Sequence, residues 1–236
     1  MRETTPDQAA PDPGLAARIA GVIMSPTATF EAVVRRPRAL GVLLAVLAAM
    51  ILSQGLFLAT EAGQQAALDQ QLRAIEAFGA QLPDDAVRQM EERMVYAPYL
   101  GAANLLVSVP LACAVVAALL HVVFGLLGGG TATFRQAFAV VAHAGVILAV
   151  SSLFLMPLSY ARGAFAAANL GVFFPMLDET TFASYVLGAI DLFLVWWVVV
   201  VGIGASVLYR RRPGAVVGGL LGVYVAVALV IAFVRS

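Results

Sequence analysis

The chain has no lysine, one cysteine and two histidines among its 236 residues. Cys113 alone cannot form a disulfide within the chain, and one cysteine with two histidines is too small a set for a structural zinc site. The 14 arginines balance the 14 acidic residues, so there is no net positive charge for binding nucleic acid. We therefore expect no metal ion, no cofactor and no nucleic-acid partner.

Charged residues of both signs are scarce, and hydrophobic residues are in excess. Only 12% of the residues are charged and 61% are hydrophobic, whereas a typical soluble domain has about 25% charged and about 45–50% apolar residues. A helix needs roughly 20 apolar residues to cross the hydrocarbon core of a bilayer. Five segments reach that length: 39–60, 99–127, 134–158, 182–209 and 214–234. Since no alternating strand pattern is present, the sequence predicts an all-α, polytopic membrane helix bundle with five transmembrane helices.

The arginines are distributed unevenly between the two sides of these helices. Nine lie on the side of the N-terminus and five lie on the other side. Because connecting segments rich in basic residues stay in the cytoplasm, we expect a cytoplasmic N-terminus and an outer C-terminus in the inner membrane of a bacterium. The arginines expected at the cytoplasmic membrane surface are Arg35, Arg36, Arg38, Arg135, Arg210, Arg211 and Arg212.

Three regions lie outside the predicted spans. Residues 1–13 are polar and rich in proline, which predicts a disordered lead. Residues 14–38 contain short amphipathic helical patterns, which lie on the cytoplasmic membrane surface or form a cap packed on the bundle. Residues 61–97 carry two apolar stripes, which predict a helical hairpin on the outer side. Those stripes pack on each other or on a partner.

Asp191 is the one acidic residue inside a predicted span. A lone carboxylate is costly in lipid, so we expect it to face the bundle and to find a polar partner. The candidate partners are His143 on the third span and Asn104 or Ser108 on the second. These groups form either a proton or ion site or a hydrogen-bonded lock between helices. His121, near the cytoplasmic end of the second span, is a further candidate for this intramembrane polar site.

Glycines recur in the last two spans. Gly214, Gly218 and Gly222 repeat every four residues on the fifth span, and Gly202 and Gly204 lie late in the fourth. Small residues in such rows let helices approach closely in lipid. We expect them to pack the fourth and fifth spans together, and the alternative is a homodimer face.

Motifs for catalysis are missing from the sequence. No Ser/His/Asp set is locally spaced for nucleophilic catalysis, and there is no His-Glu-x-x-His motif. The glycines at 128–130 lack the Lys-Ser/Thr ending of a phosphate-binding loop. The sequence therefore predicts a protein that is not an enzyme.

Several short motifs follow one another along the chain. They are Ser25-Pro26 ahead of Phe30, His121 ahead of the segment 128–138, Val140 with His143, Asn169-Leu170, Ile190-Asp191-Leu192-Phe193, Trp196-Trp197, and Gly202 with Gly204. Their order and spacing resemble the Yip (Rab-interacting protein) domain family, in its bacterial branch, over about residues 15–234. The resemblance implies a five-span helical fold with a cytosolic N-terminus. Eukaryotic members are similar to trafficking factors that associate with Rab GTPases, whereas for bacterial members the resemblance implies no settled activity.

These observations favour a non-enzymatic Yip-family membrane protein that organises partner proteins or lipids in the bacterial inner membrane. Its expected partners are membrane lipids, a second copy of the chain or other membrane proteins. The alternative is a small transporter or channel that uses Asp191 and His143 near the middle of the membrane.

Overall fold

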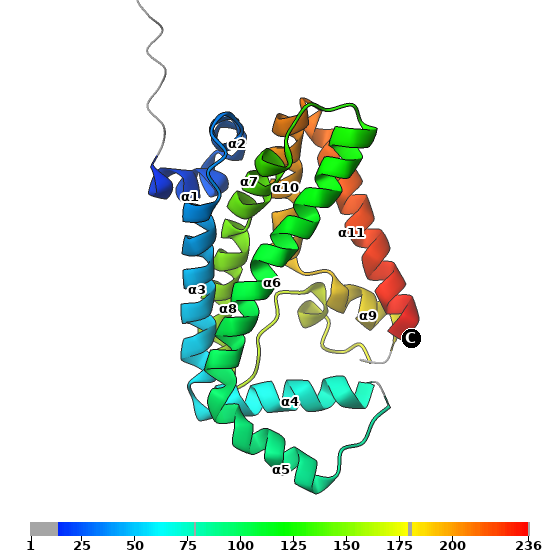
Figure 1. The fold of residues 1–236 in the computed structure, drawn as a ribbon. Coiled ribbons are helices and arrows are strands. Elements are labelled where there is room, and N and C mark those ends of the chain that lie inside the picture. The colour runs from blue at the N-terminus through cyan, green and yellow to red at the C-terminus, as the bar shows by residue number, and fades with distance from the viewer. Residues whose placement is uncertain (1–13, 78, 179–180, 236) are drawn as a thin grey trace, which may run out of the picture.

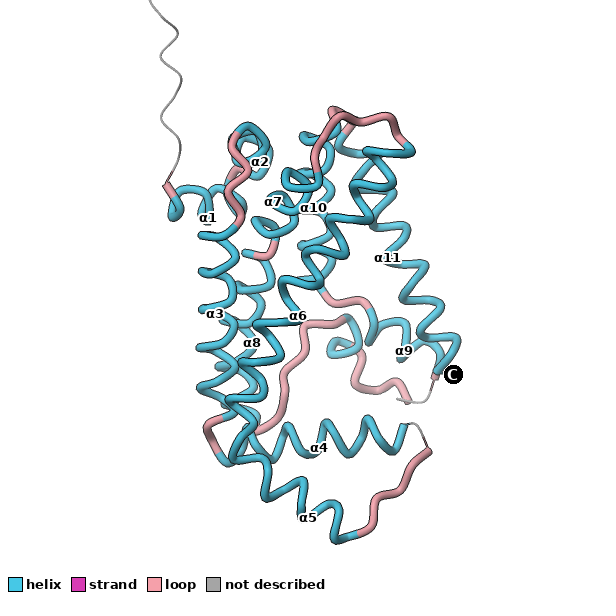
Figure 2. Tube along the Cα trace, viewed as in Figure 1, coloured by secondary structure: helices cyan, strands magenta, loops and turns pink. Residues whose placement is uncertain are grey.

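Helices form nearly all the regular structure in the computed structural model, which describes residues 14–77, 79–178 and 181–235 (Figure 1 and Figure 2). Within those residues the α-helices are α1 (Leu15–Met24), α2 (Pro26–Arg35), α3 (Leu40–Leu58), α4 (Glu61–Ala77), α5 (Asp84–Arg93), α6 (Ala97–Leu120), α7 (Phe134–Ala144), α8 (Val146–Arg162), α9 (Phe182–Ala189), α10 (Leu192–Tyr209) and α11 (Pro213–Arg235). A 3-10 turn at Met94–Tyr96 precedes α6, a π-helical segment at His121–Leu127 follows it, and a second 3-10 turn lies at Leu170–Phe173.

Five helical stretches among the described residues are long and apolar enough to cross a membrane, which confirms the predicted number. They are Leu40–Leu58, Asp84–Leu127, Phe134–Arg162, Leu192–Tyr209 and Pro213–Val234. Four of them each contain nearly all of the corresponding predicted apolar segment. A helix suits such a segment because it satisfies its own backbone hydrogen bonds within lipid. The orientation of the bundle across the membrane rests on the arginine count and stays a prediction.

The predicted fourth span is wrong at its start. The sequence suggested one helix over 182–209, but the chain is extended at Ile190 and Asp191, and this separates the short α9 from α10. Asp191 pairs with Asn169 in an antiparallel bridge, and the N–H of Leu170 donates to the carbonyl of Ile190 at 2.9 Å. The fourth span is therefore α10 alone, with 18 residues.

The helix α7 is the most deeply buried element of the bundle. Its residues Ala137 and Ala139 to Ala144 are all 0% exposed, and it packs against α2, α6 and α10. Thr133 and Gln136 form a reciprocal capping box at its start. Because this capped helix is enclosed on several sides, a polar side chain on its buried face is held in a fixed position.

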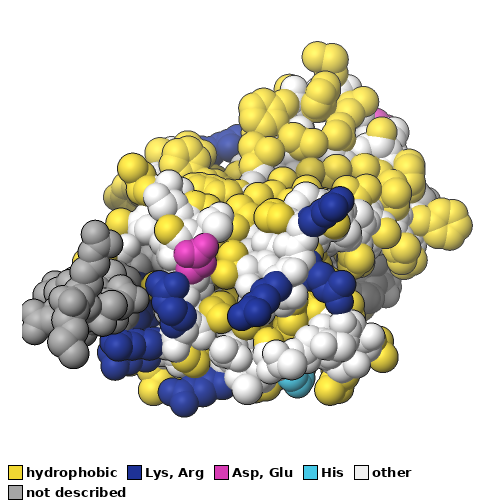
Figure 3. Space-filling view, turned by 90° about the horizontal axis from the view of Figure 1, so that it is seen from above, with side chains coloured by type: hydrophobic (Ala, Val, Ile, Leu, Met, Phe, Trp, Pro, Cys, Tyr) yellow, Lys and Arg dark blue, Asp and Glu magenta, His cyan; other side chains and the backbone are white. Residues whose placement is uncertain are grey.

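Helices α1 and α2 pack on one end of the bundle (Figure 1). Val22, Phe30 and Val33 are fully buried, and a Cβ added at Gly204 of α10 would lie 3.1 Å from the ring of Phe30. Of the two interpretations of residues 14–38, packing on the bundle is the one seen here, and contact with a membrane surface stays a prediction. Arginine side chains gather on this end (Figure 3), which we call the arginine end.

The helices α4 and α5 lie at the opposite end of the bundle, within the segment where the sequence predicts a helical hairpin (Figure 1). Leu68 of α4 is buried in one cluster with Leu58 and Met94, and Leu72 and Met90 pack against that cluster. The stripe of α4 therefore packs on the end of α3 and on Met94 in the turn after α5, whereas α5 itself has no buried residue. Packing of the two stripes on each other along their length stays a prediction. Their location outside the cytoplasm stays a prediction.

Candidate functional site

Asp191, the predicted intramembrane acid, caps a helix. Its carboxylate accepts hydrogen bonds from the backbone N–H groups of Phe193 at 2.8 Å and Leu194 at 2.9 Å. The first N–H groups of a helix have no partner within the helix, so a carboxylate at this position satisfies them and interacts favourably with the helix dipole. The hydroxyl of Tyr224 on α11 accepts from the N–H of Asp191 at 3.0 Å and donates to the carbonyl of Ala189 at 2.9 Å. These bonds fix the junction between α9 and α10 against α11.

The prediction that Asp191 and His143 share a site is wrong. A Cβ added at Gly204 would touch Val140, which is about one turn from His143 on α7. Asp191 precedes Gly204 by 13 residues, or roughly 20 Å of helix. The physical reason is that the carboxylate finds its partners in the adjacent backbone N–H groups and needs no side chain from α7.

The remaining predicted members of this polar site are dispersed. Asn104 is exposed on α6 and Ser108 is half-buried on the same helix. His121 begins the π-helical segment, where its ring lies against Gly125 and its Nδ1 atom is buried without a hydrogen-bond partner among the described residues. None of these three side chains is among the described residues that line the pocket of His143.

The predicted packing glycines fall into three groups. The atoms nearest to a Cβ added at Gly204 belong to Val140 of α7 and Phe30 of α2, so this glycine does not pack the fourth span on the fifth. A Cβ added at Gly202 would lie 2.8 Å from Val217, so this glycine sets the close contact between α10 and α11. No atom lies within 4 Å of a Cβ added at Gly214, Gly218 or Gly222. The prediction that these three pack the fifth span on the fourth is therefore wrong, because they lie on a face of α11 that meets no other described helix. A homodimer through that face stays a prediction.

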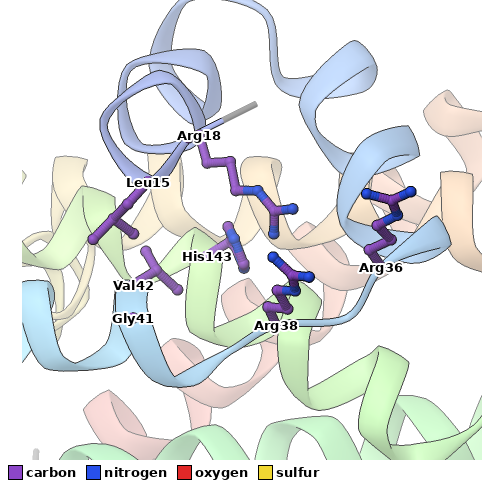
Figure 4. A pocket seen from close by; sticks show the side chains of 8 residues that line it. Leu15, Arg18, Arg36, Arg38, Gly41, Val42 and His143 are labelled. Carbon is purple, nitrogen blue, oxygen red and sulfur yellow. The ribbon is translucent and has the colours of Figure 1, made fainter. Parts of the chain in front are cut away.

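The arginine end contains a pocket of about 430 Å³. Its lining comes from α1, the link between α2 and α3, the start of α3, and α7, and consists of Gly14, Leu15, Arg18, Arg36, Arg38, Gly41, Val42 and His143. Arg18 and Arg38 extend toward each other beside the ring of His143 (Figure 4). Three guanidinium groups and one imidazole ring therefore line the same cavity, and its described lining contains no carboxylate. We call this cavity the arginine pocket.

Arg18 is the residue of this pocket that sequence reasoning missed. It is only 5% exposed although it is charged. Arg18 and the buried Val22 are four residues apart on α1 and so share one face of the helix, and this spacing was the available signal. The three pocket arginines also make interactions within the protein, so a ligand would join cations that the fold already orients.

His143 is fully buried on α7 and lines the arginine pocket. Its Nδ1 atom lies 2.7 Å from the carbonyl oxygen of Ala139. Since a carbonyl oxygen can only accept, Nδ1 carries the hydrogen of this bond. The Nε2 atom is buried and has no hydrogen-bond partner among the described residues. Buried polar atoms are seldom left without a partner, so Nε2 marks the pocket as a candidate binding site.

The seven arginines expected at the membrane surface lie at the arginine end in different settings. Arg36 and Arg38 line the pocket. Arg211 donates from Nη2 to the carbonyl of Gly128 at 2.6 Å, which ties the turn after α10 to the turn before α7. The others, which are all exposed, are Arg35, Arg135, Arg210 and Arg212. Contact of these groups with a membrane surface stays a prediction.

A larger, apolar cavity of about 620 Å³ lies between α6, α10 and α11. Its lining includes Trp197 and Tyr224 among valines, leucines and glycine, and contains no charged side chain among the described residues. The indole Nε1 of Trp197 is buried and has no hydrogen-bond partner among the described residues. This cavity lies between three helices that can span a membrane, so its chemistry suits a hydrocarbon chain.

A comparison with known protein families gives a match over most of the chain. The model of the Yip1 domain family matches residues 20–234, from within α1 to the last turn of α11. No curated protein and no solved structure matches the chain. Within the described residues no group of three His, Cys, Asp or Glu side chains could hold a metal ion.

Proposed function

This chain belongs to the Yip1 domain family of multi-pass membrane proteins, and we propose that it organises anionic lipids, and through them partner proteins, in the inner membrane of a bacterium without catalysing a reaction. The observation that carries this proposal is the arginine pocket, where Arg18, Arg36 and Arg38 line one cavity. Members of the family are generally non-enzymatic membrane trafficking proteins.

The level of the pocket along the bundle supports a lipid headgroup as its ligand. Arg38 lies two residues before Leu40, where the first helix able to span the membrane begins. Lipid headgroups occupy the layer directly outside the hydrocarbon core, and a basic residue in that layer is attracted to anionic lipid by about 1 kcal/mol. These arginines would therefore meet anionic headgroups in a bilayer, in addition to the interactions that they make within the protein.

The chemistry of the pocket supports binding rather than catalysis. Among the described lining residues there is one histidine, but no serine, threonine, cysteine, aspartate or glutamate. A nucleophile with an adjacent base is the usual requirement for covalent catalysis. A transporter built on Asp191 and His143 has no supporting observation, because the carboxylate of Asp191 caps α10.

The proposal is tested by the lipids that stay with the purified protein. We expect the wild-type chain, extracted from a bacterial membrane in mild detergent, to be enriched in anionic over zwitterionic lipids. The double substitution Arg36→Gln and Arg38→Gln should lower the affinity for anionic lipid about tenfold or more, because two cations are lost near the headgroups. Lipid extraction followed by mass spectrometry measures the enrichment.

The matched control removes two arginines from the other end of the molecule. Arg88→Gln with Arg93→Gln changes the net charge by the same amount, and both residues are exposed on α5. This control should keep the wild-type lipid enrichment. Equal lipid content in all three proteins, matching that of the bulk membrane, would contradict the proposal.

A further inference from the structure

We propose that the apolar cavity between α6, α10 and α11 binds an acyl chain of an anionic phospholipid whose headgroup lies against Arg212. The inference takes the anionic lipid as partner from the proposed function and adds a second place in the bundle that holds it. The apolar cavity and the arginine pocket share no described lining residue, so the two sites depend on different side chains.

The apolar cavity lies in a gap between two groups of helices. Helix α6 packs mainly on α3 and α7, whereas α11 packs mainly on α10 and α9, and α6 and α11 diverge away from the arginine end in Figure 1. The ring of Phe124 stacks on Tyr209 with 5.5 Å between centroids. Arg211 donates to the carbonyl of Gly128 at 2.6 Å. These contacts hold the ends of the helices together, so the gap is built into the fold.

The lining of the apolar cavity is almost entirely hydrocarbon. Apart from Trp197 and Tyr224 it consists of valine, leucine, alanine, glycine and phenylalanine side chains. The hydroxyl of Tyr224 is already bonded to the backbone of Ala189 and Asp191. Water does not fill an apolar cavity, because it finds no polar partners there, and an empty cavity loses dispersion contacts along its lining. An alkyl chain is therefore the better occupant.

The apolar cavity opens sideways, between α6 and α11. Leu119 and Val123 on one side and Val223 on the other line the cavity, and each is at least half exposed. All three lie on helical stretches that are long and apolar enough to cross a membrane. A lipid chain can therefore enter the cavity directly from the bilayer.

The width of the apolar cavity favours a chain over a helix from a second copy of the protein. Its lining on α11 extends from Ala215 to Tyr224, which is roughly 13 Å of helix. A volume of about 620 Å³ over that length gives a mean cross-section of about 50 Å². A helix with its side chains is about 10–12 Å wide and needs about 80 Å² or more. An extended alkyl chain is much thinner and fits.

Arg212 continues the cavity-lining face of α11 by one turn. Ala215, Gly219 and Val223 line the cavity at intervals of four residues, and Arg212 lies three residues before Ala215, a spacing that places two residues on one face. The carbonyl of Arg212 accepts from the N–H of Ala215 at 3.1 Å, so the helical pattern includes it. Its side chain is exposed in the turn between two spanning helices, where headgroups lie. A cation therefore stands one turn beyond a chain site.

The test is photo-crosslinking of the full chain in nanodiscs of phosphatidylcholine. They contain a small share of phosphatidylglycerol that carries a diazirine in the middle of one acyl chain, and mass spectrometry of peptides identifies the labelled residues. We expect adducts on the cavity-lining parts of α6 and α11 to exceed those at the exposed Leu44 of α3 about fivefold or more. Equal labelling of all exposed faces of the spanning helices would overturn the inference.

Two neighbouring glycines provide a blocking variant and its matched control. A Cβ added at Gly218 or at Gly219 meets no atom within 4 Å, but only Gly219 lines the apolar cavity. Gly219→Phe should place a ring in the cavity and lower the adducts there about tenfold, whereas Gly218→Phe should leave them within about twofold. Thermal melts show whether both variants are folded. Undiminished adducts in a folded Gly219→Phe would overturn the inference, and if this variant does not fold, the wild-type adduct map still decides.

A second pair of variants tests the headgroup. Arg212→Gln should lower the adducts of the phosphatidylglycerol probe in the cavity about fivefold, and leave those of a phosphatidylcholine probe with the same chains within about twofold. Arg88→Gln, which removes an exposed arginine from α5 at the other end, should change neither. Equal yields of the two probes in the wild type would overturn the assignment of an anionic headgroup.

The remaining outcomes separate this inference from its rivals. Loss of a dimer in Gly219→Phe, seen as a halved protein mass in native mass spectrometry, with unchanged lipid adducts would assign the cavity to a second copy and overturn the inference. The Arg36→Gln and Arg38→Gln variant should keep the adducts in the apolar cavity. Failure of the proposed function would therefore appear in that variant, and failure of the acyl-chain site would appear in Gly219→Phe.

Discussion

Two polar regions interrupt the apolar helices, and they differ in how completely the protein satisfies their hydrogen bonds. At the junction between α9 and α10, the carboxylate of Asp191 and the hydroxyl of Tyr224 are both bonded to backbone groups. In the arginine pocket, His143 has one nitrogen bonded to Ala139 and one without a partner among the described residues. The comparison teaches that a rare polar residue in a membrane bundle becomes a site candidate through an unmet hydrogen bond rather than through its charge.

The two regions also differ in their electrostatics. The negative charge of Asp191 lies at the N-terminus of α10, where the helix dipole compensates it. The pocket instead brings Arg18, Arg36 and Arg38 to one cavity whose described lining holds no acid. The junction is therefore suited to holding the fold together, and the pocket supplies the positive charge on which the proposed function rests.

The largest expected effect concerns the contact between α2 and α10. Helix α2 directly precedes the pocket residues Arg36 and Arg38 in the chain. Gly204→Val should lower the free energy of unfolding by about 1–3 kcal/mol, because a Cβ there would lie 2.5 Å from Val140 and 3.1 Å from the ring of Phe30. It should also weaken anionic-lipid binding. The control Gly222→Val places the same side chain where no atom lies within 4 Å of its Cβ. Equal destabilisation in thermal melts of the two variants would contradict this packing argument.

The next effect tests whether Asp191 acts as a cap. Asp191→Ala should cost about 1–2 kcal/mol of stability, because two N–H groups at the start of α10 lose their acceptor. Asp191→Asn keeps an oxygen acceptor and should stay within about 0.5 kcal/mol of the wild type, since asparagine is also a good cap. Unfolding curves in detergent measure both. A loss with asparagine as large as that with alanine would show that the charge matters, and would weaken the contrast with His143.

A smaller effect is expected from the other side of the same junction. Tyr224→Phe removes the hydroxyl that joins the N–H of Asp191 and the carbonyl of Ala189. We expect a loss of about 1 kcal/mol, measured by the same unfolding curves. Tyr160→Phe removes an exposed hydroxyl from α8 and serves as a comparison. If Asp191→Ala and Tyr224→Phe act on one junction, the double variant should lose less than the sum of the two single losses.

The sequence predicted the number of spanning helices well because the signal is local. An uncharged run of about 20 residues is visible by counting, and lipid leaves it few conformations other than a helix. The same count failed at 182–209, because the residues of α9 are also mostly apolar and carry no charge. The break is held by backbone hydrogen bonds of Ile190 with Leu170 and of Leu192 with Ala168, and by the bond from the N–H of Asp191 to the hydroxyl of Tyr224. These partners are distant in sequence and invisible to a hydropathy window.

The candidate site was only partly predictable for a related reason. His143 was singled out because histidine is rare in this chain, but it was paired with Asp191, since spacing along two helices does not give their relative depth. Arg18 was missed, because its burial depends on how α1 folds back on α3 and α7. The packing partners of the glycine rows could not be predicted for the same reason. A four-residue spacing shows which glycines share a face, but only the packed bundle shows that Gly202 has a neighbour and Gly222 has none.

The smallest expected effect on stability gives the sharpest test of the comparison between the two regions. His143→Phe should change the free energy of unfolding by no more than about 0.5 kcal/mol, although the residue is fully buried. The lost bond to Ala139 is offset by removal of the buried Nε2 that has no partner among the described residues, and replacing such a group by an apolar ring of similar shape is often nearly neutral. His143→Ala is the control that shows the sensitivity of the assay, because the cavity it leaves should cost about 2–4 kcal/mol. If His143→Phe were as destabilising as Asp191→Ala, the histidine would be a structural group like the aspartate, and its unused nitrogen would no longer distinguish a binding pocket from a helix junction.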